Sequence, residues 1–280
     1  MRTIIKFIWP IIAILFFACE DVVEIDVPES NPRLVIEASL DWEKGSLGNN
    51  QSITLNNTTT YFDDERLNPV SDAIVTVYNV ETASEFRFLE QEAGVYSTDT
   101  FIPLIDNTYR LEVLYEGETY VAEERMTSVA TIDSLTQSRE EGFDKDLLEL
   151  NIYFSDPENE VNSYLIWCES NKDLFPYMFD INDEFINGNQ VHHTYEKDDD
   201  IDNGLYPFEP DEIVEVKLFG ISENYYRYIG LLISQSGGGN PFGAVPATLR
   251  GNIVNTTNRE NYALGYFRTA EVDTKELTFQ

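Results

Sequence analysis

The chain has 280 residues, and its 51 acidic against 18 basic side chains give it a formal net charge of −33. Nucleic-acid phosphates repel such a surface, so the composition excludes a general nucleic-acid-binding protein. Hydrophobic residues make up 42% of the chain and aromatic residues 13%, which is enough for folded cores and excludes a disordered acidic chain.

The first 18 residues have the three parts of a bacterial secretory signal. Arg2 and Lys6 supply a positive start, residues 11–17 form an apolar run, and the small residue Ala18 precedes Cys19. A small residue before a cysteine is also the pattern of a lipoprotein signal, in which the thiolate takes a lipid and the chain is cleaved before it. We therefore predict a signal peptide over residues 1–18 and lipidation at Cys19. The alternative is a plain secretory signal that leaves the thiol free.

After the cysteine, residues 19–32 are acidic and contain two prolines, which predicts a tether. Short strand-like runs begin at residue 33 and are separated by Gly, Pro, Asn and Asp turns. This pattern predicts an antiparallel β-sandwich of immunoglobulin or fibronectin type over residues 33–127. The pair Glu116-Gly117 predicts a hairpin within it.

Strand signals continue through the second half, where Asn187-Gly188 predicts another hairpin. One segment has a helical period. Ser222 is a helix-capping residue, and the apolar stripe that follows includes Tyr225 and Ile229. We therefore predict a second, β-rich domain over residues 128–280 with one packed α-helix near 222–236. The fold class is mainly β.

The residues offer little support for catalysis. The chain has no G-x-S-x-G, H-E-x-x-H, P-loop or G-x-G-x-x-G pattern. His192 and His193 are adjacent in a strand-like run, so their side chains point to opposite faces and make a poor joint metal site. Cys168 lies in an apolar run and is expected to be a buried, inert thiol. We expect the protein not to be an enzyme.

Residues 198–209 carry acidic side chains at the spacing of a calcium loop. Asp198, Asp200, Asp202 and Glu209 stand at relative positions 1, 3, 5 and 12. Asn203, however, replaces the glycine that such loops have at position 6. The segment therefore predicts either a calcium site formed by these four residues or an acidic, solvated loop between strands.

Aromatic residues near the C-terminus suggest a contact surface. Tyr225 and Tyr226 lie on the predicted helix, and Phe242 follows in a glycine-rich loop. Tyrosine rings stack on sugars and peptides, so these three residues are candidates for a ligand or partner. The alternative is that the tyrosines pack the helix on a sheet.

Several segments together resemble a known family. They are NPRLVIEASL (31–40), NTYRLEVLYEGETYVAE (107–123) and VEVKLFGISENYYRYIGLL (214–232). They are similar to a Bacteroidota lipoprotein family catalogued as a domain of unknown function (number 4249). The resemblance covers nearly all of the mature chain. It assigns no catalytic residues.

The resemblance implies a lipoprotein of the outer membrane or cell surface, often encoded beside TonB-dependent transporters. Glu20 and Asp21 resemble the acidic signal that directs such lipoproteins to the cell surface. The expected function is a lipid-anchored accessory or binding protein that works with a TonB-dependent transporter in nutrient uptake. A calcium-stabilised adhesion or interaction module is the alternative, and a glycosidase or esterase is the weaker third reading.

Overall fold

The computed structural model describes residues 31–59, 68–158, 160–182, 187–199, 206–236 and 248–280. The predicted signal peptide, Cys19 and the acidic pair after it lie outside these ranges. Residues Pro32–Gln280 form one compact unit. It is mainly β with one α-helix in the described part of the chain, so the predicted fold class is confirmed. None of the helical structure described there is both long and apolar enough to span a bilayer.

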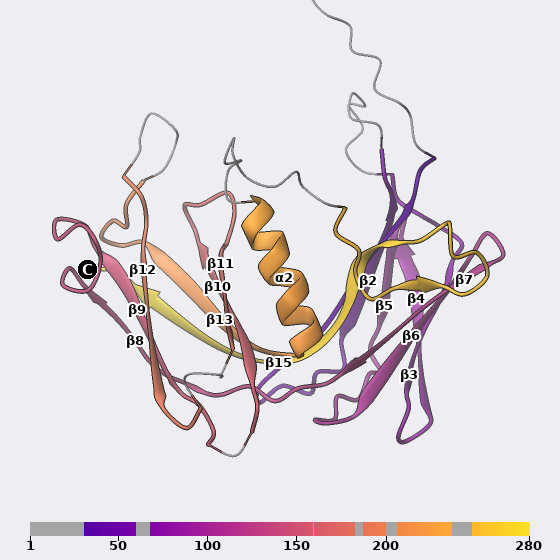
Figure 1. Cartoon of the computed structure of the whole chain (residues 1–280), viewed down its shortest axis with the longest axis horizontal. Helices are drawn as coiled ribbons and strands as arrows, with labels where there is room; N and C mark the ends of the chain where they lie inside the picture. The colour runs from indigo at the N-terminus through magenta and orange to yellow at the C-terminus, as the bar shows by residue number, and fades with distance from the viewer. Residues whose placement is uncertain (1–30, 60–67, 159, 183–186, 200–205, 237–247) are drawn as a thin grey trace, which may run out of the picture. The chain divides into compact units, whose positions relative to one another are not determined.

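The first half is a sandwich of two antiparallel layers (Figure 1). Its strands are β1 (Leu34–Glu43), β2 (Gln51–Asn57), β3 (Ile74–Asn79), β4 (Ser84–Glu92), β5 (Val95–Thr98), β6 (Thr108–Tyr115) and β7 (Glu118–Arg125). One layer has the order β1-β2-β5 and the other β4-β3-β6-β7. The end of β4 also bonds to β5, past an irregularity between Glu90 and Glu92.

Alternation of buried and exposed residues explains why these runs become strands. In β1, Leu34, Ile36, Ala38 and Leu40 point into the core while the residues between them are more exposed. The hairpin predicted at Glu116-Gly117 is confirmed. Both residues have positive φ, 49° and 79°, and Tyr115 pairs with Glu118 across the turn.

The second half repeats the strand order of the first. Its strands are β8 (Ile132–Ser138), β9 (Glu149–Ser155), β10 (Ser163–Ser170), β11 (Tyr177–Asn182), β12 (Gln190–Glu196), β13 (Ile213–Ile221) and β15 (Leu264–Thr278). The first, second and fifth strands form β8-β9-β12, and the others form β11-β10-β13-β15. The second half is therefore another sandwich of the same topology, which is more specific than the β-rich domain predicted.

One predicted turn has a different role. Asn187 and Gly188 do form a turn, with φ of 74° at the glycine. The strands on either side of it, however, pair with other strands: β11 with β10, and β12 with β9. The turn therefore carries the chain from one layer of the sandwich to the other instead of joining two paired strands. A local turn signal cannot distinguish these cases, because the pairing partners are distant in sequence.

The predicted helix is confirmed as α2 (Glu223–Ser236). The Ser222 hydroxyl accepts a hydrogen bond from the Tyr225 N–H at 3.1 Å, which is the expected N-cap. The helix lies over β10 and β11 (Figure 1). Tyr225 and Ile229 are buried there in one cluster with Leu165, Phe219 and Ile221.

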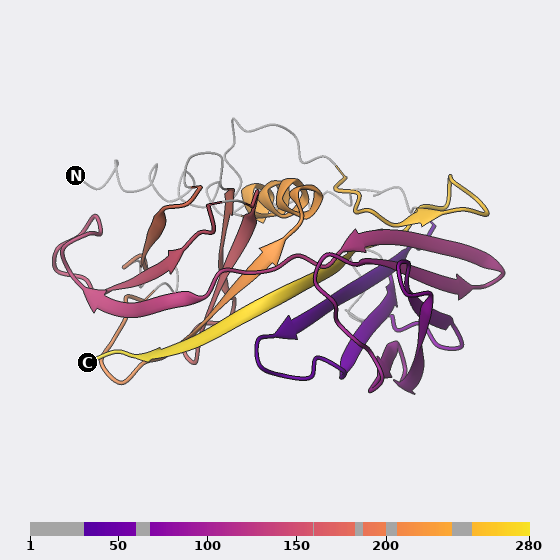
Figure 2. The same ribbon diagram turned by 90° about the horizontal axis from the view of Figure 1, so that it is seen from below.

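After the helix, the chain returns to the first sandwich. The short strand β14 (Val254–Asn255) pairs with β7, and the long strand β15 then runs parallel to β1 before pairing with β13 (Figure 2). Ile253, Ala263 and Phe267 consequently lie in the core of the first sandwich. The two-domain division after residue 127 stays a prediction, and a C-terminal segment contributes to both cores.

Candidate functional site

A pocket of about 370 Å³ lies where β15 changes partners. Val272 is paired with Glu43 of β1 on one side and with Phe219 of β13 on the other. The lining residues come from four strands: Asp41, Glu43, Trp167, Lys217, Phe219, Arg268, Val272 and Thr274. We call this the Arg268 pocket. It contains side chains of both sandwiches, so neither half forms it alone.

Arg268 is the distinctive residue of this pocket, because its charged side chain is only 7% exposed. One terminal nitrogen, Nη2, lies 2.8 and 2.6 Å from the two carboxylate oxygens of Asp41. The other, Nη1, donates to the Tyr225 hydroxyl at 3.3 Å. The Nε–H has no hydrogen-bond partner in the described part of the chain. A buried donor without a partner is uncommon in folded proteins, and it adds to the cost of burying this cation.

The surroundings keep this guanidinium charged. Burial by itself lowers the pKa of Arg268, but the nearby Asp41 carboxylate and Tyr225 raise it above the ordinary arginine value. The guanidinium carbon also lies 4.6 Å from the centre of the Phe219 ring and 5.0 Å from that of Tyr225. Aromatic faces attract a cation in this geometry. The pocket wall therefore contains a guanidinium that stays charged and is paired with Asp41.

Two further side chains give the pocket an amphipathic character. Trp167 and Lys217 are neighbours across the β10–β13 pair. The indole N–H of Trp167 donates to Glu169 at 2.8 Å, and the Lys217 ammonium lies 2.6 Å from Glu215. These bonds orient an indole ring next to the Lys217 ammonium. The arrangement suits a small polar molecule with one flat apolar face.

Tyr225, predicted as a ligand residue, does not line the pocket itself but contacts Arg268, which does. Its ring is buried on Tyr266 at a centroid distance of 4.9 Å, and its hydroxyl holds Arg268. Tyr266 in turn donates to Glu124 at 2.9 Å, and burial raises the pKa of that carboxyl group. This polar network lies beneath α2. Tyr225 therefore packs the helix on the sheet, as the alternative interpretation of the tyrosines expects.

Of the other predicted site residues, those that the structure describes do not line this pocket. Tyr226 is half-buried and lines a cleft at the start of α2, and Phe242 lies outside the described residues. Asp200 and Asp202 of the calcium hypothesis also lie outside them, while Asp198 is exposed.

The part of the calcium segment that is described shows one ion pair. The Glu209 carboxylate is 2.5 Å from the Lys172 ammonium. No group of three or more His, Cys, Asp or Glu residues within the described ranges is arranged to hold a metal ion. Because two of the four proposed ligands are not described, calcium binding at this segment stays a prediction.

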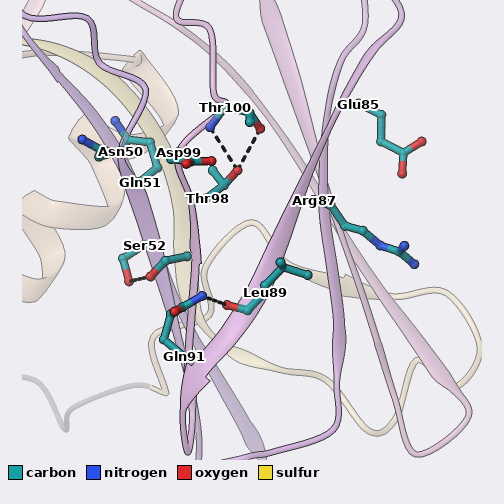
Figure 3. A pocket seen from close by; sticks show the side chains of 11 residues that line it. Asn50, Gln51, Ser52, Glu85, Arg87, Leu89, Gln91, Thr98, Asp99 and Thr100 are labelled. Carbon is teal, nitrogen blue, oxygen red and sulfur yellow. Dashed lines mark hydrogen bonds between the residues drawn. The ribbon is translucent and has the colours of Figure 1, made fainter.

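A larger groove, of about 820 Å³, lies on the first sandwich where β4 separates from β5 (Figure 3). Glu85, Arg87 and Leu89 of β4 form one side of it. Hydroxyl and amide side chains form the other, and several of them bond to each other, as Ser52 does to Ser97 at 3.2 Å. We call it the polar groove. It has no aromatic surface and no buried charge, so it is a weaker candidate for a specific site.

The sequence did not single out Arg268, Asp41 or Trp167. Arg268 directly follows the aromatic residues Tyr266 and Phe267 in β15, which is a signal for a buried charge that needs a partner. Asp41 lies 227 residues away, so no local pattern links the two.

These features define the class of the protein as a pair of tandem fibronectin-like sandwiches with a small pocket at their shared strand. The chain belongs to the family described as "Domain of unknown function (DUF4249)", whose model matches residues 20–276. No curated protein matches its sequence.

Among solved structures, a two-domain fibronectin type-III segment of chicken tenascin matches with 10% identity and a TM-score of 0.22, over 68% of this chain and 91% of that one. The FN1–FN3 domains of chicken CNTN1 match with 12% identity and a TM-score of 0.24, over 66% and 62%. A DUF4785 family protein from Legionella pneumophila matches with 9% identity and a TM-score of 0.27, over 67% of this chain and about half (52%) of that one. At these TM-scores the likeness assigns neither a ligand nor a partner, and the fold description stands on the strand pairing.

Proposed function

We propose that this chain is a lipid-anchored binding protein of the outer membrane or cell surface that assists a TonB-dependent transporter in nutrient uptake. Lipidation at Cys19, with Glu20 and Asp21 as export signal, attaches it to the membrane. It acts by binding and not by catalysis. The observation that carries the binding role is Arg268, a largely buried cation that lines a pocket beside Trp167 and Phe219.

The proposed ligand is a small polar molecule with a flat face, such as a sugar. Its flat face stacks on Trp167, and its oxygen atoms accept hydrogen bonds from Arg268 and Lys217. Asp41 already balances the charge of Arg268, so the pocket does not require a highly charged ligand. Oxygen-rich neutral or zwitterionic nutrients fit this chemistry best.

Tryptophan fluorescence tests the proposed pocket directly. The sequence has three tryptophans, and one of them, Trp9, is in the predicted signal peptide. In a Trp42→Phe variant, Trp167 becomes the reporter in the cleaved chain. Titration with mono- and oligosaccharides, amino acids and short peptides is expected to give a saturable change with at least one of these classes.

Calorimetry then measures how tightly the wild type and its variants bind the ligand that gave the largest saturable change. Trp167→Ala and Lys217→Ala should each weaken binding about tenfold, the effect of losing one stacking or charged contact. Lys172→Ala removes a similar cation outside the pocket and should leave binding unchanged. Equal affinity of the three variants would exclude this pocket as the ligand site.

Purification from membranes tests the proposed partner. An affinity-tagged chain extracted from outer membranes in mild detergent is expected to retain a TonB-dependent transporter. A Cys19→Ser variant should lose the membrane fraction and, with it, most of the transporter. Recovery of the wild-type chain alone would contradict the transporter role while leaving the ligand pocket to be judged by its own titrations.

A further inference from the structure

Another pocket, of about 450 Å³, is lined by arginines and by no carboxylate. Its lining residues stand on and around β14, the short strand that pairs with β7. Arg250, Arg259 and Tyr262 line it, together with Asn255 and small or apolar residues. The Arg268 pocket and the polar groove both include acidic side chains. In a chain with 51 acidic and 18 basic residues, a lining with two arginines and no carboxylate is unusual.

The ring of Tyr262 lies between two guanidinium groups. The central carbons of Arg33 and Arg250 are each 3.7 Å from the centre of this ring. Two planar cations at that height do not fit over one face, so they occupy opposite faces. The ring attracts both and separates their like charges. We call Arg33, Arg250, Arg259 and Tyr262 the arginine pocket.

The backbone around the arginine pocket is fixed before any ligand arrives. Asn255 is 1% exposed, and its amide oxygen accepts the N–H groups of Thr257 and Asn258 at 3.0 and 2.8 Å. The Asn252 side chain exchanges two hydrogen bonds with the backbone of Phe267 in β15. An arginine held on such a loop loses less freedom on binding than one on a free chain.

The charges of the arginine pocket are not neutralised by the residues that the structure describes. No ion pair there joins Arg33, Arg250 or Arg259 to a carboxylate. Arg33 does donate from Nη1 to the Glu260 carbonyl at 3.1 Å, which orients it without removing its charge. The nearby Glu118 carboxylate is bound by Asn261, Asn255 and Tyr120. The positive field is therefore available to a ligand.

We infer that the arginine pocket is an oxyanion site that binds a phosphate group. Planar guanidinium groups bind phosphate oxygens through paired N–H donors, and Arg250 and Arg259 approach the same pocket. The net charge of −33 repels anions at long range, so binding rests on short-range contacts. This site is separate from the Arg268 pocket and does not depend on the function proposed for it.

The phosphate has two sources that the same chemistry fits, a lipid headgroup or a soluble phosphate ester. Arg33 follows directly on the predicted tether, residues 19–32, whose extended length is at most about 50 Å. If Cys19 is lipidated, as proposed above, this reach brings headgroups within range of the arginine pocket. Of the two sources, only the lipid headgroup rests on the proposed function; the soluble phosphate ester does not.

Two binding measurements on the Cys19→Ser full chain test the site. Removal of the thiol prevents a lipid anchor from dominating the result. Calorimetry uses glycerol 3-phosphate, with glycerol as the uncharged comparison. Co-sedimentation uses vesicles of phosphatidylcholine with and without phosphatidylglycerol. Saturable binding of glycerol 3-phosphate identifies a soluble phosphate as sufficient, and binding only to the anionic vesicles identifies the lipid source.

Variants locate the binding. The Arg250→Ala/Arg259→Ala double variant should weaken it about tenfold or more, the effect of losing a charge-assisted bond. Arg139→Ala removes an exposed cation of the second sandwich and should leave it unchanged. Tyr262→Phe keeps the stacking ring and should bind as the wild type, whereas Tyr262→Ala should bind more weakly. Absence of binding in both measurements, or equal loss with Arg139→Ala, would overturn the inference.

Discussion

Arg268 of β15 and Asp41 of β1 form a salt bridge with unequal burial. The guanidinium is 7% exposed and the carboxylate 33% exposed, with a shortest N···O distance of 2.6 Å. The two residues lie on parallel neighbouring strands that the chain brings together from opposite ends. Because the arginine is the buried partner, it depends on Asp41 more than Asp41 depends on it.

The first prediction follows from this asymmetry. Asp41→Ala leaves a buried, uncompensated cation and should lower the free energy of unfolding by about 3–5 kcal/mol. Arg268→Met fills a similar volume and leaves a carboxylate that water can reach, so its cost should be less than half of that. Urea unfolding of both variants measures the difference. Equal losses of unfolding free energy in the two variants would contradict the idea that the buried Arg268 is the partner that depends on the other.

The second prediction concerns the linker between the sandwiches, which crosses β13 at Gly220. A Cβ atom there would lie 1.9 Å from the Ser128 carbonyl oxygen, and the Thr127 hydroxyl donates to the Gly220 carbonyl at 2.6 Å. Gly220→Ala should therefore cost at least about 2 kcal/mol of unfolding free energy, since backbone must move.

Gly230 of α2 is the matched control for this substitution. Its nearest obstacle is the Asp180 carboxylate at 3.0 Å, the free end of a flexible side chain. Gly230→Ala should be neutral or stabilising by up to about 1 kcal/mol, because alanine favours the helix. Thermal unfolding of both variants compares them, and a Gly220→Ala protein as stable as Gly230→Ala would refute the close crossing.

Local patterns explain which parts of this fold are predictable from sequence. The helix α2 has its cap at Ser222 and its stripe within one segment, and the Glu116-Gly117 turn joins adjacent strands, so both were predicted. The parallel pairing of β1 with β15 joins Ile36 to Gly265 and depends on contacts across the whole chain. No periodicity shows such a partner, and the Arg268 pocket depends on it. The contact between Arg33 and Tyr262 also joins residues far apart in the sequence, so no local pattern indicates it.

The third prediction is a loss of stability in mild acid that arises from His193. Burial, with a smaller effect of His192, lowers the pKa of His193 from 6.5 to about 4. Its ring stacks on Phe179 at 4.2 Å, and its Nε2 lies 3.1 Å from the Tyr177 hydroxyl. The unfolded chain therefore binds a proton at a higher pH than the folded one. The free energy of unfolding therefore decreases as the pH falls from about 6.5 to about 4. Below about 4, His193 is protonated in both states and causes no further decrease.

The full size of this acid effect is on the order of 3 kcal/mol, at about 1.4 kcal/mol for each pKa unit. His193→Phe keeps an aromatic ring and removes the titration, so its unfolding free energy should change less between pH 7 and pH 4.5. His192→Gln alters the exposed neighbour and should retain the wild-type slope. Chemical unfolding at several pH values gives these slopes. An unchanged slope in His193→Phe would assign the acid sensitivity to other groups.

The fourth prediction lies at lower pH and concerns Glu149. Burial by itself raises its pKa, but hydrogen bonds from the Ser138 hydroxyl and from the N–H groups of Glu141 and Gly142 lower it to about 2. The folded state therefore favours the ionised form, and the stability it contributes is lost as the pH falls from about 4.5 towards 2. Glu149→Gln should remove this dependence. Unfolding curves below pH 4.5 measure it, and a slope equal to that of the wild type would contradict the assignment.

The fifth prediction uses the thiol of Cys168 to measure the integrity of the second core. The residue is 3% exposed, and burial raises the pKa of its thiol to about 12. The thiolate is the reactive form, so an aromatic disulfide reagent should react very slowly with the folded Cys19→Ser chain. In urea, one equivalent of thiol should react at once. Ser134→Cys, at an exposed position of β8, is the control and should react in the folded protein.

Fast reaction of Cys168 without denaturant would mean that the β10–β13 layer opens readily. If the linker that crosses β13 at Gly220 holds this layer closed, the Gly220→Ala substitution should accelerate the reaction of Cys168.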